Sequence, residues 1–144
     1  MIFKHYYCDL YKANVVLYAY CTTQEANDHY QQSFEKTDVS LFDLDQEHGG
    51  YVTPVYSSKG ERFFVVWLQD DYLETLVHES FHVVARIFEE VGIGLTEDNH
   101  EPWAYYLEYW VAKFRETLKE FVKDEAKKKH RQKKRKEKKV QDQP

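Results

Sequence analysis

The chain has 144 residues, with 25 acidic and 20 basic side chains and a formal net charge of −5. This length suffices for one domain with its own core but not for two. Two cysteines, Cys8 and Cys21, are too few for a disulfide framework, which excludes the small disulfide-rich secreted class and is typical of a reducing compartment. No stretch approaches the roughly 20 apolar residues of a membrane span, and the first ten residues lack a signal-peptide pattern. We therefore expect a cytoplasmic protein without membrane contact.

The first third of the chain predicts strands followed by a surface helix. Aromatic and β-branched residues dominate 2–11 and 14–20, as is typical of a strand pair. Thr22 and Glu25 have the spacing of a capping box, in which each residue satisfies a backbone amide of the other. They start a mostly polar helix that we expect to end near Glu35.

The next segment predicts three short strands. Residues 39–44 alternate between polar and apolar, and the glycine pair that ends 45–50 indicates a loop. Two further strands are expected at 51–56 and 62–68. Because proline cannot donate a hydrogen bond to a neighbouring strand, Pro54 places its strand at a sheet edge or a bulge.

One long amphipathic helix is predicted at 71–91. Its apolar side chains recur every three or four residues, namely Leu73, Leu76, Val77, Phe81, Val84, Ile87, Phe88 and Val91. Asp71 is the expected N-cap, and Glu74 would complete a capping box. The strand at 62–68 leads directly into this helix, so we expect its free edge to lie alongside and to accept an extended peptide.

Within this helix, His78 and His82 lie one turn apart on a single face. Two imidazoles at that spacing can point their nitrogens at one site about 2.0–2.1 Å away, which is the bond length of tetrahedral zinc. Glu79 follows the first histidine and can take a proton from a metal-bound water as a general base. The alternative, a structural histidine pair, would need partners for four ring nitrogens. The pattern favours a Zn²⁺ site with Glu79 as the catalytic residue.

Catalytic zinc keeps three protein ligands and one open position, so a third ligand should follow. Glycines at 92 and 94 end the helix, and Pro102 suits the first turn of the next one. Glu101 then lies at the start of that helix and is the preferred third ligand, because a carboxylate completes a His₂Glu set. Glu108, two turns further on, and the loop residue His100 are the alternatives.

The last helix is predicted from Pro102 through Val122. Its buried stripe consists of Leu107, Trp110, Val111, Phe114, Leu118 and Phe121. Residues 123–144 have no such stripe and should be mobile even if they extend the helix locally. We therefore divide the chain into a domain at 1–122 and a C-terminal tail at 123–144.

The net charge hides a strong asymmetry. Residues 127–144 hold ten Lys or Arg and two acids, a charge of +8, while residues 1–126 carry −13. A basic run such as 127–139 binds phosphate backbones in a salt-sensitive way. The alternatives are a solvated tail and a tail that rests on an acidic surface, including that of its own domain.

The segment His78-Glu79-Ser80-Phe81-His82, followed by a glycine-containing connector and Glu101-Pro102-Trp103-Ala104-Tyr105, resembles the gluzincin metallopeptidases. More narrowly, it is similar to the small metallopeptidase-like proteins encoded by bacteriophages and to the single-domain minigluzincins. The resemblance covers about residues 61–120. It implies an α+β, zincin-like fold: a small twisted mixed sheet with a surface helix, a metal helix and a following glutamate helix.

The same resemblance implies a Zn²⁺ ion held by His78, His82 and Glu101, and an edge strand at 61–68 just before the metal helix. We expect hydrolysis of a peptide or protein substrate with Glu79 as general base, in the host cytoplasm if the protein is phage-encoded. Tyr105 or Tyr106 could donate a hydrogen bond to the developing oxyanion. Two alternatives from other classes are a non-catalytic phage–host interaction protein on a zincin scaffold and a nucleic-acid-associated module that acts through the basic tail.

Overall fold

The computed structural model describes residues 1–33, 41, 49–57 and 59–141, and the side chains among them up to residue 135. The strand predicted at 39–44 therefore lies outside the described residues except for Leu41. The described parts form, in chain order, β1 (Ile2–Cys8), β2 (Ala13–Ala19), α1 (Thr23–Ser33), β3 (Gly50–Tyr56), β4 (Arg62–Leu68), α2 (Leu73–Glu90) and α3 (His100–Gln141).

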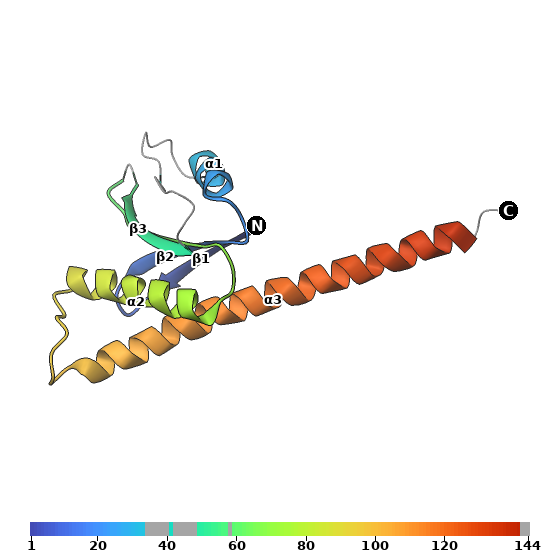
Figure 1. Ribbon diagram of the computed structural model, residues 1–144. Coiled ribbons are helices and arrows are strands. Elements are labelled where there is room, and N and C mark those ends of the chain that lie inside the picture. Colours follow the sequence, from blue (N-terminus) through green and yellow to red (C-terminus); the bar gives the residue numbers. More distant parts are fainter. Residues whose placement is uncertain (34–40, 42–48, 58, 142–144) are drawn as a thin grey trace.

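The four strands make one mixed sheet in the order β1-β2-β4-β3 (Figure 1). β1 pairs with β2 and β3 pairs with β4 in antiparallel fashion. β2 and β4 are parallel, with Val16 opposite Val65. The chain must cross from β2 to β4, and α1 and β3 lie within that connection. The prediction of an α+β chain with a small mixed sheet is confirmed.

The strand that leads into α2 is not an edge strand, so that prediction was wrong. β4 is hydrogen-bonded to β2 on one side and to β3 on the other. Its residues from Phe63 to Leu68 are all buried, because both faces of the sheet are covered. The edge belongs to β3, which confirms the edge position predicted from Pro54.

Two helices cover one face of the sheet and one helix covers the other (Figure 1). Alternate residues of the central strands separate into two cores, as the two-residue period of a strand requires. Leu17 and Val66 pack with the buried faces of α2 and α3. Val16 and Val65 belong to the second core, which includes Tyr30 of α1. The two central strands, β2 and β4, are thus buried on both faces.

The two predicted helix caps had different outcomes. The capping box of α1 is confirmed, since the Thr22 amide donates to Glu25 Oε2 at 2.8 Å and the Glu25 amide donates to Thr22 Oγ1 at 3.1 Å. The capping box of Asp71 and Glu74 was wrong, because α2 has Tyr72 at its N-cap and no side-chain cap bond. Instead Asp70 Oδ1 accepts a hydrogen bond from the Tyr72 amide at 3.0 Å.

Helix α3 packs against α2 and then continues past the sheet (Figure 1). Its buried side chains include Trp110, Phe114 and Leu118. The helix extends to Gln141, so the predicted boundary between residues 122 and 123 lies inside one continuous helix. None of the described helices combines the length and apolar character needed to cross a membrane.

Candidate metal site

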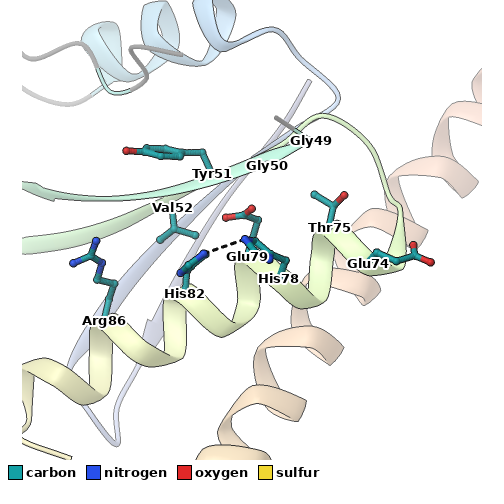
Figure 2. Close-up of a pocket in the computed structure, with 10 residues that line it drawn as sticks. All are labelled: Gly49, Gly50, Tyr51, Val52, Glu74, Thr75, His78, Glu79, His82 and Arg86. Carbon is teal, nitrogen blue, oxygen red and sulfur yellow. Dashed lines mark hydrogen bonds between the residues drawn. The ribbon is translucent and has the colours of Figure 1, made fainter. Parts of the chain in front are cut away.

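A pocket of about 600 Å³ lies between the start of β3 and one side of α2 (Figure 2). Its lining includes both histidines of the predicted metal pair and the glutamate between them. β3 contributes the upper wall and α2 the floor. The lining residues are Gly49, Gly50, Tyr51, Val52, Glu74, Thr75, His78, Glu79, His82 and Arg86.

His78 and His82 point their Nε2 atoms toward each other at a distance of 3.1 Å (Figure 2). Two ligands bound to tetrahedral zinc at 2.0–2.1 Å are about 3.3 Å apart, so the pair has nearly the bite that zinc requires. The same distance also suits a hydrogen bond between two neutral imidazoles. The helical spacing therefore produces the predicted convergence of the two rings.

The surroundings of His82 favour its neutral form. Partial burial, and then the nearby His78 and Arg86, lower the pKa of this imidazole below its usual value. A neutral imidazole is the form that binds a metal ion. Arg86 lies one turn beyond His82 and lines the same pocket, so the pocket also contains a cationic group that could meet an anionic part of a ligand.

Glu79 is the buried carboxyl of the site, with an exposed fraction of 4%. Burial raises the pKa of this group to about 7. The side chain lines the pocket beside the two imidazoles rather than pointing into solvent (Figure 2). A carboxyl group in this position can hold or release a proton near neutral pH.

The glycine pair at the start of β3 determines how closely the strand approaches α2. A Cβ at Gly50 would lie 2.6 Å from Cγ of Glu79, and a Cβ at Gly49 would lie 3.1 Å from Oγ1 of Thr75. In the sequence this glycine pair predicts only a loop, and its contribution to the site follows from the structure. Two glycines directly before a β-rich run are the signal that could have revealed it, since glycine often marks a close backbone approach.

The predicted third ligands do not line the pocket. His100 and Glu101 lie 3.5 Å apart, Nε2 to Oε1, and are about two-thirds exposed. Glu108 is also exposed on α3. Within the part of the chain that the structure describes, no group of three or more His, Cys, Asp or Glu side chains is arranged to hold a metal ion. Glu101 as third ligand stays a prediction.

The helix faces explain this separation. Glu79 and His82 line the side of α2 that faces β3. The start of α3 packs on a neighbouring side of α2, where the Trp103 ring lies 5.0 Å from that of Phe88 and 6.0 Å from that of Phe81. At 100° per residue, Phe88 lies about 80° around α2 from His78 and about 120° from His82.

The two tyrosines considered for oxyanion stabilisation also lie outside the pocket. Tyr106 is buried and donates its hydroxyl hydrogen bond to Cys8 Sγ at 3.4 Å, while Tyr105 is 68% exposed on another surface hollow. Tyr51 on β3 also borders the pocket, but its ring points away from the two histidines (Figure 2).

Comparisons with known proteins give no family for the chain. No family model and no solved structure matches it. A curated protein that matches is the CRISPR system Cmr subunit Cmr2 of Pyrococcus furiosus, with 29% identity over 77 residues, or 54% of this chain. The chain spans 8% of the length of that relative. A match of this extent carries no functional assignment, so a function must be argued from the pocket itself.

Proposed function

We propose that the protein is a zinc-dependent hydrolase that cleaves peptide bonds at the pocket between β3 and α2. The observation that supports this most strongly is the 3.1 Å separation of His78 Nε2 and His82 Nε2, with the Glu79 carboxyl in the same pocket. In this proposal the two histidines and Glu101 hold the metal. The zincin-like fold and the relation to gluzincins are part of the same proposal.

Each protein group has a distinct task in this chemistry. A bound Zn²⁺ would lower the pKa of a coordinated water towards about 7 and polarise the substrate carbonyl. Glu79 accepts a proton from the attacking water and passes it to the leaving amine. Its burial against Gly50 fixes the carboxyl within the pocket, and a fixed base is more effective than a mobile one.

A peptide is the substrate favoured by the position of β3. This strand pairs only with β4 among the described strands, so its other edge can accept an extended chain. Val52, near the start of β3, lines the pocket beside His82 (Figure 2). A peptide added along β3 would thus pass over the proposed reaction centre, held by main-chain hydrogen bonds.

Zinc content tests the metal site directly. We expect close to one zinc ion per chain in protein purified without added metal or chelator, as measured by inductively coupled plasma mass spectrometry. His82→Ala should lose this zinc, whereas His130→Ala, an exposed residue on the far part of α3, should retain it. Metal-free wild-type protein that binds no added zinc would overturn the assignment.

Hydrolysis of labelled, denatured casein tests the role of Glu79. Glu79→Gln should keep the fold and the zinc, because glutamine has nearly the shape of the neutral carboxyl, yet lose hydrolysis. Glu74→Gln is the matched control, since this exposed glutamate lines the same pocket. If Glu79→Gln is as active as the wild type, Glu79 is not the base. A zinc-loaded wild type that cleaves nothing favours the alternative of an interaction protein on the same scaffold.

A further inference from the structure

The far part of α3 forms a strongly basic helical segment, residues 127–135, which we call the basic arm. Seven of its nine residues are Lys or Arg and none is acidic. All nine side chains are exposed, and the backbone is helical throughout. Figure 1 shows this part of α3 extending away from the sheet and the other helices.

Contacts of α3 with the rest of the domain end before the arm begins. Leu118 is the last fully buried residue of the helix, at 2% exposure, and the ring of Phe121 stacks on Tyr20 at 5.4 Å. From Val122 to Arg135 every residue is exposed except Glu125, which is half-buried. The residues of the arm thus make no core contacts, and their positive charge must have another role.

The positive charges lie on two opposite sides of the helix rather than on one. At 100° per residue, five of them lie within about 120° of one another, namely Lys127, Lys128, Arg131, Lys134 and Arg135, and the other two, Lys129 and Lys133, lie on the opposite side. The arm contains no aliphatic or aromatic residue. A helix that lies on a membrane surface needs an apolar face, so the arm is unsuited to that partner. An acidic protein surface would contact the charges on one side of the helix only.

We propose that the basic arm binds double-stranded DNA by lying in the major groove. That groove is about 12 Å wide and admits an α-helix, whose diameter with side chains is about 10–12 Å. Phosphates line both walls of the groove, so a helix with charges on two opposite sides can neutralise both strands. The major groove of double-stranded RNA is deep and narrow and does not admit side chains in this way. This binding is independent of the proposed zinc site.

The acidic domain does not cancel the attraction. At 1.5 Å per residue, Arg131 lies about 15 Å along the helix from Phe121. The Debye length is about 8 Å at physiological salt, so repulsion between the acidic domain and a bound duplex is largely screened at that distance. Two arm lysines also have acidic neighbours on α3, since Lys127 pairs with Asp124 at 3.1 Å and Lys128 with Glu125 at 2.8 Å. We therefore expect the phosphate contacts chiefly at Lys129, Arg131, Lys134 and Arg135.

The test uses the full chain and a fluorescein-labelled 20-base-pair DNA duplex of arbitrary sequence, with anisotropy measured from 50 to 200 mM KCl. We expect wild-type affinity to fall about 10³-fold over this range, as for a protein that contacts some six phosphates. The arm variant carries four substitutions, Lys129→Gln, Arg131→Gln, Lys134→Gln and Arg135→Gln. Its slope of log affinity against log salt should be flatter by about 3 to 4, since each phosphate contact contributes about 0.9.

A control variant carries the same change of net charge at exposed positions outside the arm: Lys4→Gln, Lys59→Gln, Arg115→Gln and Lys119→Gln. We expect it to bind like the wild type. Equal loss in both variants would show that only net charge matters and would overturn the proposal. Equal wild-type affinity for an RNA duplex of the same sequence would overturn the choice of partner, as would binding to phosphatidylserine vesicles or poly-glutamate but not to DNA. His82→Ala should bind DNA normally, which separates this proposal from the zinc hypothesis.

Discussion

Gly50 on β3 and Glu79 on α2 are in such close contact that a Cβ on the glycine would lie 2.6 Å from Cγ of the glutamate. Side-chain carbons do not approach each other this closely, so any larger residue at position 50 must displace the carboxyl or the strand. The Glu79 carboxyl can therefore occupy its position only because residue 50, on the strand facing α2, has no side chain. This dependence leads to a direct test.

Gly50→Ala should lower the free energy of unfolding by about 1–3 kcal/mol, the usual cost of overpacking a filled site. It should also displace Glu79, so we expect hydrolysis to fall in protein that is still folded. Urea unfolding followed by circular dichroism measures the first effect. Gly94→Ala is the matched control, because an added Cβ there meets nothing within 4 Å. Similar stability of the two variants would show that the contact relaxes without cost.

The elements of the fold were largely predictable because their periodicity is strong, but their order in the sheet was not. Helix α2 and the histidine face follow from apolar spacing. The edge strand was misassigned because β4 directly precedes α2 in the sequence, which suggested that one edge of β4 lies free beside that helix. Its run from Phe63 to Leu68 is apolar at every position, which is the pattern of a strand buried on both faces. The run itself therefore indicates a central strand.

Substituting each candidate third ligand in turn is expected to show which of them binds the zinc ion. If Glu101 completes the zinc set, Glu101→Gln should weaken zinc binding by more than the roughly 10- to 100-fold that loss of an outer-shell partner costs. Glu108→Gln and His100→Ala should change it far less. Competition with a chromophoric chelator measures these affinities. A strong loss in one of the other two variants, with Glu101→Gln unaffected, would reassign the ligand.

The pair of histidines could be predicted from sequence because i and i+4 residues of one helix are neighbours whatever the fold. A third ligand from another element depends on which flank of α2 faces α3, and that is decided by tertiary packing. Trp103 packs on Phe88, which lies about 80° around α2 from His78 and about 120° from His82. Spacing along the chain contains no information about that flank. The sequence therefore predicted the local part of the site better than the long-range part.

Alkaline unfolding tests the contact between β1 and α3. The Tyr6 hydroxyl shares a 2.6 Å hydrogen bond with Thr117, and burial raises the Tyr6 pKa to about 12. The ordinary value is about 10. Between these pH values the native state keeps a proton that the unfolded chain has lost, so the unfolding free energy falls as pH rises.

Tyr6→Phe should therefore be less stable than the wild type at pH 7, by about 1 kcal/mol for the lost hydrogen bond, but lose less stability between pH 10 and 12. Urea unfolding at each pH measures this, and Tyr7→Phe, an exposed neighbour on β1, serves as the control. Parallel curves for Tyr6→Phe and the wild type would show that Tyr6 does not contribute to the alkaline loss.

Deletion of residues 127–144 should leave thermal stability and zinc content almost unchanged, even though it removes part of a continuous helix. The deleted segment lies beyond Leu118 and Phe121, which make the last core contacts of α3. Helical continuity by itself contributes little to stability, because most of the stability of a helix in a protein comes from packing of its apolar face. We expect a change in unfolding free energy within about 0.5 kcal/mol, as for surface changes in general.

Leu118→Ala in the full chain provides the contrast and should cost roughly 2–5 kcal/mol. Calorimetry of the two variants beside the wild type measures both effects. If the truncated protein melts as early as Leu118→Ala, the tail supports the domain through contacts with its acidic surface, and the arm would no longer be free to bind DNA.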